Sequence, residues 1–299
     1  METQQLRYVV AVARSGNFSR AAEQCHVAQP SLSQQIRKLE EEIGERLFVR
    51  LPRQAKLTAA GEHFIPRALR ILEEMDTAHR EARGNKELTC GRIVLGVLPT
   101  IAPYLLPQLI PNFSAQFPGI EIVMHEDTTA RLMQLALACE LDMAIVSLPI
   151  RDDRFDVAEL FREDLLLALP PGHALTKRKK ISLGDLDGES FILMKEGHCL
   201  GDQVLNFCEK RDFHPRVSCR STQIETIQAL VKAGMGISLI PEMAVRSPES
   251  GAPVYLAMQK PKPQRTIAAI WLRQRSPGPA AAELLRRLHG SAPKVRSPR

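Results

Sequence analysis

The chain has 299 residues, 44% of them hydrophobic, and a formal net charge of +6 at pH 7. This length suits two or three domains with a substantial core. No apolar run approaches the roughly 20 residues that a membrane span needs, and the start METQQLRYVV lacks a signal-peptide pattern. We therefore expect a cytoplasmic protein that is not embedded in a membrane. Six cysteines without CxxC or CxxH spacing argue against a zinc site and a disulfide framework.

The charge is unevenly distributed along the chain. Residues 1–90 hold 14 basic and 12 acidic residues (+2), residues 91–258 hold 16 and 21 (−5), and residues 259–299 hold 10 and 1 (+9). The mildly acidic centre is not a second nucleic-acid surface. The basic C-terminal segment is more simply a solvated tail than a contact to DNA or a second subunit, and residues from Gly290 onward are predicted to be disordered.

Two short helices joined by a tight turn are predicted between residues 17 and 44. The second begins near Pro30, whose missing N–H costs nothing in a first helical turn, and ends at Gly44. One stripe of this helix is apolar and should be buried. The opposite face carries hydrogen-bonding and cationic groups that favour DNA recognition over a merely solvated face. The stripe comprises Leu32, Ile36, Leu39 and Ile43, and the polar face comprises Pro30, Ser31, Ser33, Gln34, Arg37 and Lys38.

A hairpin "wing" is predicted next, from short extended pieces at residues 47–50 and 56–58. Arg50, Arg53 and Lys56 would reach phosphates from it. The segment FSRAAEQCHVAQPSLSQQIRKLEEEIGERLFVR, followed by LTAAG, resembles the winged helix-turn-helix of LysR-type transcriptional regulators. The resemblance implies that residues 1–58 form a domain that binds double-stranded DNA and that the regulator contacts RNA polymerase. It places Gln29, Pro30, Ser31, Ser33 and Gln34 nearest the bases.

A long helix is predicted from Thr58, a suitable N-cap, to about Lys86. Because its apolar residues follow a heptad spacing that a lone helix would expose, we expect residues 59–90 to pair in a homodimer. Packing against the same chain stays open as the alternative. A two-fold protein suits two DNA half-sites about one helical turn apart, and the family resemblance implies a tetramer. The heptad residues are Phe64, Ala68, Ile71, Met75, Ala78 and Ala82.

After Gly91 the pattern alternates between strands and helices. Repeated βαβ units predict an α/β fold with a parallel sheet and helices on both faces. The layout resembles the family's effector part, two α/β lobes of periplasmic-binding-protein type joined by two crossovers. The resemblance places lobe I at residues 91–163 and 267–299, and lobe II at residues 164–266. Predicted strands cover 92–97, 120–125, 142–147, 164–169, 190–194, 216–220, 236–240 and 265–272, and predicted helices cover 101–117, 130–139, 199–210, 223–232 and 280–288.

Cys199 follows a predicted strand and opens a predicted helix. Unpaired backbone N–H groups and the helix dipole at such a position favour thiolate over thiol, and His198 would add charge or a hydrogen bond. Thiolate attacks peroxide to give a sulfenic acid, which Cys208 could convert to a disulfide. In one continuous helix nine residues separate the two Cα atoms by about 13 Å on opposite faces. Since a disulfide needs roughly 4.4–6.8 Å, this helix must unravel before the bond forms.

The same segment is similar to that of the peroxide-sensing OxyR subfamily of LysR-type regulators. Further matches are GVLPTIAPYLLP at Gly96 to Pro107, HEDTT ending at Thr129, and QRTI around Arg265. The resemblance makes Cys199 the peroxidatic and Cys208 the resolving thiol of a hydrogen-peroxide sensor. We predict no cofactor, and no metal, because Cys25 beside His26 has no further ligand at a useful spacing. The resemblance assigns the peroxide pocket to Thr100, Thr129, His198, Asp202 and Arg265. Gly201 departs from the subfamily, which usually has a basic residue there.

Two other functions stay open. One is a LysR-type regulator gated by a small anion between the lobes, with inert cysteines. The other is a thiol peroxidase with a DNA-binding appendage, although the sequence offers no separate general base or reductase motif. The remaining cysteines are interpreted as structural, namely Cys25, Cys90, Cys139 and Cys219. Three methionines, Met124, Met133 and Met194, are predicted to lie in the core.

Overall fold

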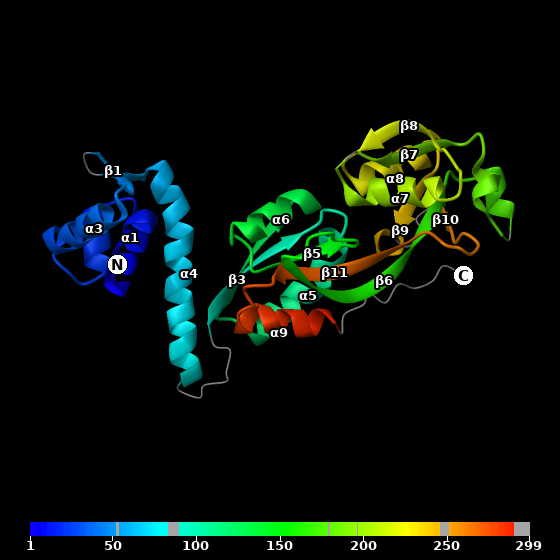
Figure 1. Ribbon diagram of the computed structural model, residues 1–299. Coiled ribbons are helices and arrows are strands. Elements are labelled where there is room, and N and C mark those ends of the chain that lie inside the picture. Colours follow the sequence, from blue (N-terminus) through cyan, green and yellow to red (C-terminus); the bar gives the residue numbers. More distant parts are fainter. Residues whose placement is uncertain (52–53, 83–89, 179, 196, 246–250, 290–299) are drawn as a thin grey trace. The chain divides into compact units, whose positions relative to one another are not determined.

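The computed structural model describes residues 1–51, 54–82, 90–178, 180–195, 197–245 and 251–289. The predictions for Arg53, for the end of the long helix near Lys86 and for the tail from Gly290 lie outside these residues. The chain divides into two compact units, Met1–Glu87 and Leu88–Arg299, which are described separately below; Figure 1 labels their elements. None of the helices in the described part of the chain is both long and apolar enough to cross a bilayer.

The first unit is a winged helix-turn-helix, as predicted. Asn17 starts the second helix because its side chain accepts hydrogen bonds from the backbone N–H groups of Ser19 and Arg20. Gly44 ends the third helix in a left-handed conformation with φ 82°. The elements are α1 Thr3–Ser15, α2 Phe18–Gln24, α3 Gln29–Ile43, the antiparallel hairpin β1 Phe48–Leu51 and β2 Gln54–Leu57, and α4 Ala59–Ala82.

The apolar stripe of α3 is shorter than predicted. Leu32, Ile36 and Leu39 are fully buried, but Ile43 is 38% exposed. Glu40 is buried instead, and its Oε1 accepts hydrogen bonds from the N–H groups of Leu47 (2.8 Å) and Phe48 (3.2 Å). The wing therefore folds back onto Glu40, and the core ends before the last turn of α3.

The predicted heptad seam of α4 is divided between two environments. Thr58 caps the helix, since its hydroxyl accepts from the N–H of Gly61 at 3.0 Å. Ala68 is buried in the core of the first unit, so this part of the seam packs within the chain. Ile71 is 39% exposed. Pairing of α4 with a second chain stays a prediction, for which the exposed part of the seam is available.

The main sheet of the second unit is mixed rather than parallel, which corrects the prediction. β4 (Ile120–Glu126) and β5 (Met143–Ser147) run parallel to β3 (Gly91–Val97), whereas β6 (Phe155–Leu169) and β11 (Gln264–Leu272) run antiparallel to each other. Of these strands, β11 is the one that runs against the others, because it lies between β5 and β6 and pairs antiparallel with both. The strand order is β10-β6-β11-β5-β3-β4, with β9 also on β6.

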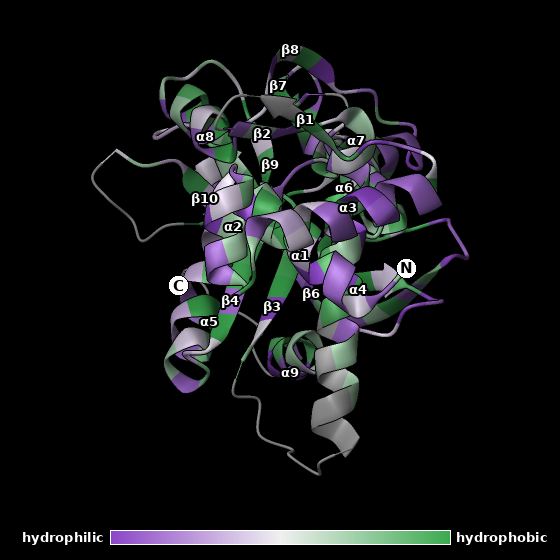
Figure 2. Ribbon diagram, turned by 90° about the vertical axis from the view of Figure 1, so that its left-hand side faces the viewer, coloured by the Kyte–Doolittle hydropathy of each residue, from purple (hydrophilic) through white to green (hydrophobic). Residues whose placement is uncertain are grey.

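Helices cover both faces of the lobe I part of this sheet. Figure 1 shows α6 (Thr129–Leu137) on one face and α5 (Ala102–Gln116) and α9 (Pro279–Leu288) on the other. The strands between them are mostly hydrophobic, while α3 of the first unit is largely hydrophilic (Figure 2). One predicted core residue is misplaced: Met124 is 49% exposed, because β4 is an edge strand with a neighbour on one side only.

The long strands β6 and β11 link the two lobes. The first half of β6 pairs with β11, and its second half pairs with β9 (Ser238–Pro241) and β10 (Val254–Leu256). Only the second half was predicted as a strand. Two separate apolar cores lie on either side of this crossover, close to the predicted lobe boundaries, which remain predictions. Lobe II adds the parallel pair β7 Ser190–Met194 and β8 Arg216–Ser221, and the helices α7 Cys199–Glu209 and α8 Ile224–Lys232.

Candidate functional sites

The predicted DNA face of α3 is open to solvent. Its short polar groups, its amides and its two cations lie on the side opposite the buried Leu32 and Ile36. Ser33 is the exception, because it is half-buried. The face can therefore meet the bases and phosphates of a groove without any rearrangement of the core. The exposed residues are Gln29, Pro30, Ser31, Gln34, Arg37 and Lys38, and Lys56 of the wing is exposed as well, whereas the side chains of Arg50 and Arg53 lie outside the described residues.

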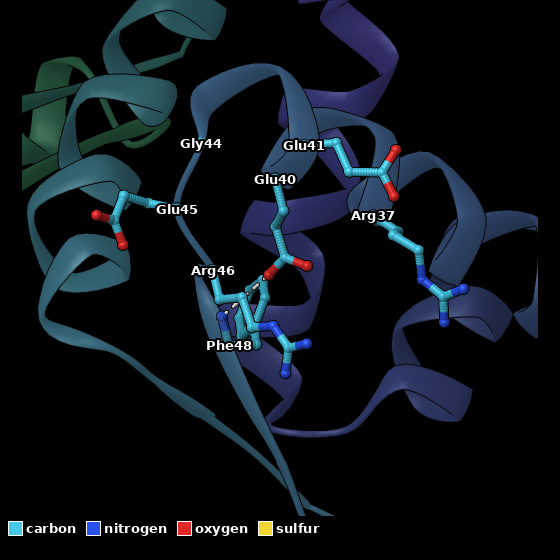
Figure 3. A pocket seen from close by; sticks show the side chains of 7 residues that line it. All are labelled: Arg37, Glu40, Glu41, Gly44, Glu45, Arg46 and Phe48. Atoms are coloured by element: carbon cyan, nitrogen blue, oxygen red, sulfur yellow. Dashed lines mark hydrogen bonds between the residues drawn. The ribbon is translucent and has the colours of Figure 1, made fainter.

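A hollow of about 490 Å³ lies at the end of α3, between this helix and the start of the wing (Figure 3). In Figure 3 the carboxylate of Glu40 points to the backbone of Phe48, and Arg37 points away from it. The lining mixes acidic and basic side chains, so it favours neither a phosphate nor a cation, and we assign it no ligand. The lining residues are Arg37, Glu40, Glu41, Gly44, Glu45, Arg46 and Phe48.

The two candidate redox thiols lie at the two ends of α7, as predicted. Cys199 is the first residue of this helix, and it is partly buried against the apolar core of lobe I. Cys208 is fully buried in the core of lobe II. One helix therefore carries its two thiols into two different cores. The described α7 is continuous, which keeps the Cα atoms about 13 Å apart.

Burial dominates the chemistry of both thiols. It raises the pKa of Cys199, although the charge of Arg265, the hydroxyl of Thr129 and the backbone N–H of Leu200 each lower that pKa. The helix terminus acts on the pKa of Cys199 in the predicted direction, through the N–H of Leu200, but the lost hydration of the anion outweighs this contribution. Burial likewise raises the pKa of Cys208 to about 11. Both thiols are protonated at neutral pH in this conformation.

A buried ion pair stands beside Cys199. Arg265 is 2% exposed, and its Nε donates to Oε1 of Glu163 at 2.6 Å. Its two terminal nitrogens donate to the hydroxyl (3.0 Å) and the carbonyl (3.1 Å) of Thr100. Glu163 also accepts from the N–H of Met243 at 3.0 Å, so both ions are well hydrogen-bonded. This network joins β6, β11 and the loop after β3.

Two unpartnered polar atoms lie in residues of the same site. Within the described residues, Oγ1 of Thr129 and Oε1 of Gln203 are buried without a hydrogen bond of normal geometry. Thr129 acts on the pKa of Cys199, and Gln203 follows Cys199 by about one helical turn. Buried polar groups normally find a partner. Each of these two oxygens can accept a hydrogen bond from a small donor such as a peroxide.

The structure brings most of the predicted pocket together. Thr129 and Arg265 both act on the pKa of Cys199, and Thr100 is hydrogen-bonded to Arg265. Asp202 is exposed, yet its charge raises the pKa of Cys199 and so lies near it. His198 precedes α7 and makes no capping hydrogen bond with its side chain.

Sequence reasoning missed Glu163 and Gln203. The spacing of Gln203, four residues after Cys199, was the one available signal for it. None of the six cysteines, all of which lie in the described ranges, forms a disulfide bond. Among the described residues, no group of three or more His, Cys, Asp or Glu side chains is placed to hold a metal ion.

Known proteins match both units. Residues 3–62 match the bacterial regulatory helix-turn-helix proteins of the lysR family, and residues 86–293 match the LysR substrate binding domain. The chain belongs to the LysR family. This is a family of DNA-binding transcriptional regulators and not of enzymes, which confirms the predicted class and excludes the thiol peroxidase.

Individual relatives extend over almost the whole chain. A hydrogen peroxide-inducible genes activator of Pectobacterium carotovorum subsp. carotovorum is 38% identical over 91% of this chain and 90% of its own length. A full-length OxyR of Pseudomonas aeruginosa with a cysteine-to-aspartate substitution is 32% identical, with a TM-score of 0.74 over 100% of this chain and 97% of that one. CbnR in complex with its target DNA is 26% identical, with a TM-score of 0.58 over 97% of this chain and 100% of the CbnR chain.

Proposed function

We propose that this LysR-family regulator senses hydrogen peroxide by reversible oxidation of Cys199 and Cys208. The observation that carries the proposal is that the two thiols lie at opposite ends of α7, with Cys199 partly buried against the core of lobe I and Cys208 buried in the core of lobe II. Oxidation of such a pair must move a helix and not merely add a covalent bond. The similarity to hydrogen peroxide-inducible genes activators and to OxyR supports the same signal.

The chemistry balances with peroxide as the oxidant. The Cys199 thiol gives up its proton, its sulfur attacks one peroxide oxygen, and the O–O bond breaks to yield Cys199 sulfenic acid and water. The sulfur of Cys208 then displaces the hydroxyl of the sulfenic acid, giving a Cys199–Cys208 disulfide and a second water. We assign the hydroxyl of Thr129, the ion-paired Arg265 and Thr100 to the peroxide pocket, with His198 and Asp202 at its rim.

The disulfide acts as a switch because of distance. The two Cα atoms must approach from about 13 Å to roughly 4.4–6.8 Å, so α7 has to unwind and lobe II has to repack. In an oligomer this alters how the effector parts of neighbouring chains meet, and hence which half-sites the N-terminal domains occupy.

The DNA side of the proposal follows from the exposed face of α3. Gln29, Pro30, Ser31, Ser33 and Gln34 lie nearest the bases, and the cations of α3 and of the wing contact phosphates. Two chains pair through residues 59–90, and dimers associate into tetramers that contact RNA polymerase, as the family resemblance implies. A regulator of this kind works in the cytoplasm, where the DNA is.

Arg265 disfavours a small anionic metabolite as the signal. Its charge is already compensated by Glu163 and two hydrogen bonds to Thr100. An anion would have to displace that buried carboxylate, at a considerable cost in free energy. Under the anion hypothesis Cys199 and Cys208 would stay equally reactive to alkylating agents before and after a peroxide pulse.

Mass spectrometry of the full-length protein tests the proposal. After one equivalent of hydrogen peroxide, the peptides containing Cys199 and Cys208 should be linked in the wild type and in the control Cys219→Ser. In Cys208→Ser, oxidation should stop at the Cys199 sulfenic acid. In a separate DNA-binding assay, the same variant should lose the oxidant-dependent change in promoter occupancy. If Cys208→Ser responds at the promoter as the wild type does, the disulfide switch is wrong.

A further inference from the structure

Gln203 ties the thiol helix of lobe II to lobe I. It lies on α7 four residues after Cys199, so the two side chains share a face of the helix. Its Nε2 donates hydrogen bonds to Oγ of Ser147 (2.7 Å) and to the carbonyl oxygen of Leu148 (2.8 Å). Both acceptors lie at the end of β5, in the other lobe. The amide group therefore spans the joint between the lobes with both of its donors in use.

The contacts of Gln203 reach the crossover strand β11 as well. The hydroxyl of Ser147 is 3.4 Å from the carbonyl oxygen of Thr266, which also accepts the N–H of Leu148 at 2.9 Å. Ser147 is 3% exposed, so this junction is shielded from water. The Leu148 carbonyl can only accept, which fixes the amide with its nitrogen toward lobe I. A hydrogen bond lost here leaves a buried polar group without a partner.

We propose that Gln203 is the latch that keeps α7 wound in the dithiol form and thereby sets how readily the Cys199–Cys208 disulfide forms. The proposal rests on the proposed function. Cys208 is held in the core of lobe II, so the end of α7 that carries Cys199 is the end that must leave lobe I. Gln203 lies between the two thiols along α7, and its hydrogen bonds to Ser147 and Leu148 break when the helix unwinds. Gln203 is a positioning residue, since it acts on the thiols through the helix.

A latch of this kind opposes oxidation by a predictable factor. Each hydrogen bond that the dithiol form has and the disulfide form lacks shifts the equilibrium roughly threefold to tenfold toward the dithiol. Removing the amide should therefore favour the disulfide, although both of its hydrogen bonds go to lobe I and neither goes to a sulfur that would form the bond. A residue with a merely structural role would lower the stability of both forms and leave their ratio unchanged.

A redox titration of the full-length protein measures this ratio without involving peroxide. The protein is equilibrated in mixtures of reduced and oxidised dithiothreitol, which exchange two electrons with the thiol pair, and the disulfide fraction is read by alkylation and mass spectrometry. Gln203→Leu should raise the equilibrium constant for the disulfide about tenfold, and Ser147→Ala about threefold. The double variant should not exceed Gln203→Leu, because the two residues share one contact. Asn206→Ala, an exposed site on the same helix, is the matched control and should not raise it.

The outcomes separate the latch from the proposed function. An unchanged equilibrium in Gln203→Leu, an equal rise in Asn206→Ala, or full additivity in the double variant overturns the latch. If the wild type forms no Cys199–Cys208 disulfide under any of these mixtures, the proposed function fails instead. If Gln203→Leu does not fold, Ser147→Ala tests the same contact from the other lobe. A rise in the equilibrium constant for the disulfide then supports the latch, and an unchanged constant overturns it.

Discussion

The helices α3 and α7 are both amphipathic, yet they present their chemistry in opposite directions. α3 buries Leu32, Ile36 and Leu39 and turns its polar side chains to solvent, where DNA can reach them. α7 turns Cys199 toward the other lobe and buries Cys208 in its own. The chemistry of α3 is thus specified by the residue types on its exposed face. The chemistry of α7 depends instead on the residues that pack against its thiols.

The largest effect is expected from removing the cation beside α7. Arg265→Met leaves Glu163 as an unpaired buried carboxylate, which should cost about 3–5 kcal/mol of stability in chemical denaturation. Adding Glu163→Gln should restore most of this stability. It should not restore the rate of Cys199 oxidation, because the neutral pair no longer lowers the thiol pKa. If the double variant oxidised at the wild-type rate, the role of Arg265 at the thiol would be excluded.

The rate of Cys199 oxidation should depend strongly on pH. Burial raises the pKa of this thiol, so the reactive thiolate is the minor species at neutral pH. The rate constant with hydrogen peroxide should rise about tenfold per pH unit until the raised pKa is passed. Rapid-mixing measurements on Cys208→Ser, which isolates the first step, test this. A rate that is flat from acidic to neutral pH would show that the thiolate already dominates.

A substitution on the face of α3 should separate DNA binding from thiol chemistry. Gln34→Ala should weaken binding to a selected specific DNA fragment about tenfold, the size of one lost base contact. Lys38→Gln, the control for a phosphate contact, should weaken specific and nonspecific binding alike and lower the salt dependence. Fluorescence titrations at several salt concentrations distinguish the two. A changed rate of Cys199 oxidation in either variant would contradict the separation of DNA binding in α3 from thiol chemistry in α7.

The smallest effect is expected at Gly201, in the first turn of α7. A Cβ there would lie 2.8 Å from the carbonyl oxygen of Met194. Glycine to alanine normally stabilises a helix by about 1 kcal/mol, but here the collision should outweigh that gain and loosen the first turn of α7. Gly201→Ala should therefore lower the unfolding free energy and favour the disulfide, whereas Asn206→Ala should not. A higher unfolding free energy in Gly201→Ala would show that α7 can move away from Met194 without a cost in stability.

Much of the fold was predictable because its signals are local. Heptad spacing, the Pro30 and Gly44 boundaries of α3 and the start of α7 at Cys199 all depend on neighbouring residues. The first half of β6 was missed, although its alternating burial is the pattern of a half-buried strand. Ile43 was misassigned because periodicity within α3 does not show where the following wing folds back onto the helix.

By itself, the sequence determined which residues carry the chemistry: a polar recognition face, two cysteines nine positions apart, and the helix between them. Only the tertiary structure decided how they behave. It set Cys199 beside Arg265 and Glu163 but deep enough for burial to raise its pKa, and it brought Gln203 to Ser147 across the joint. The physical reason is that hydration and hydrogen-bond pairing depend on residues far apart in the chain, which no local pattern records.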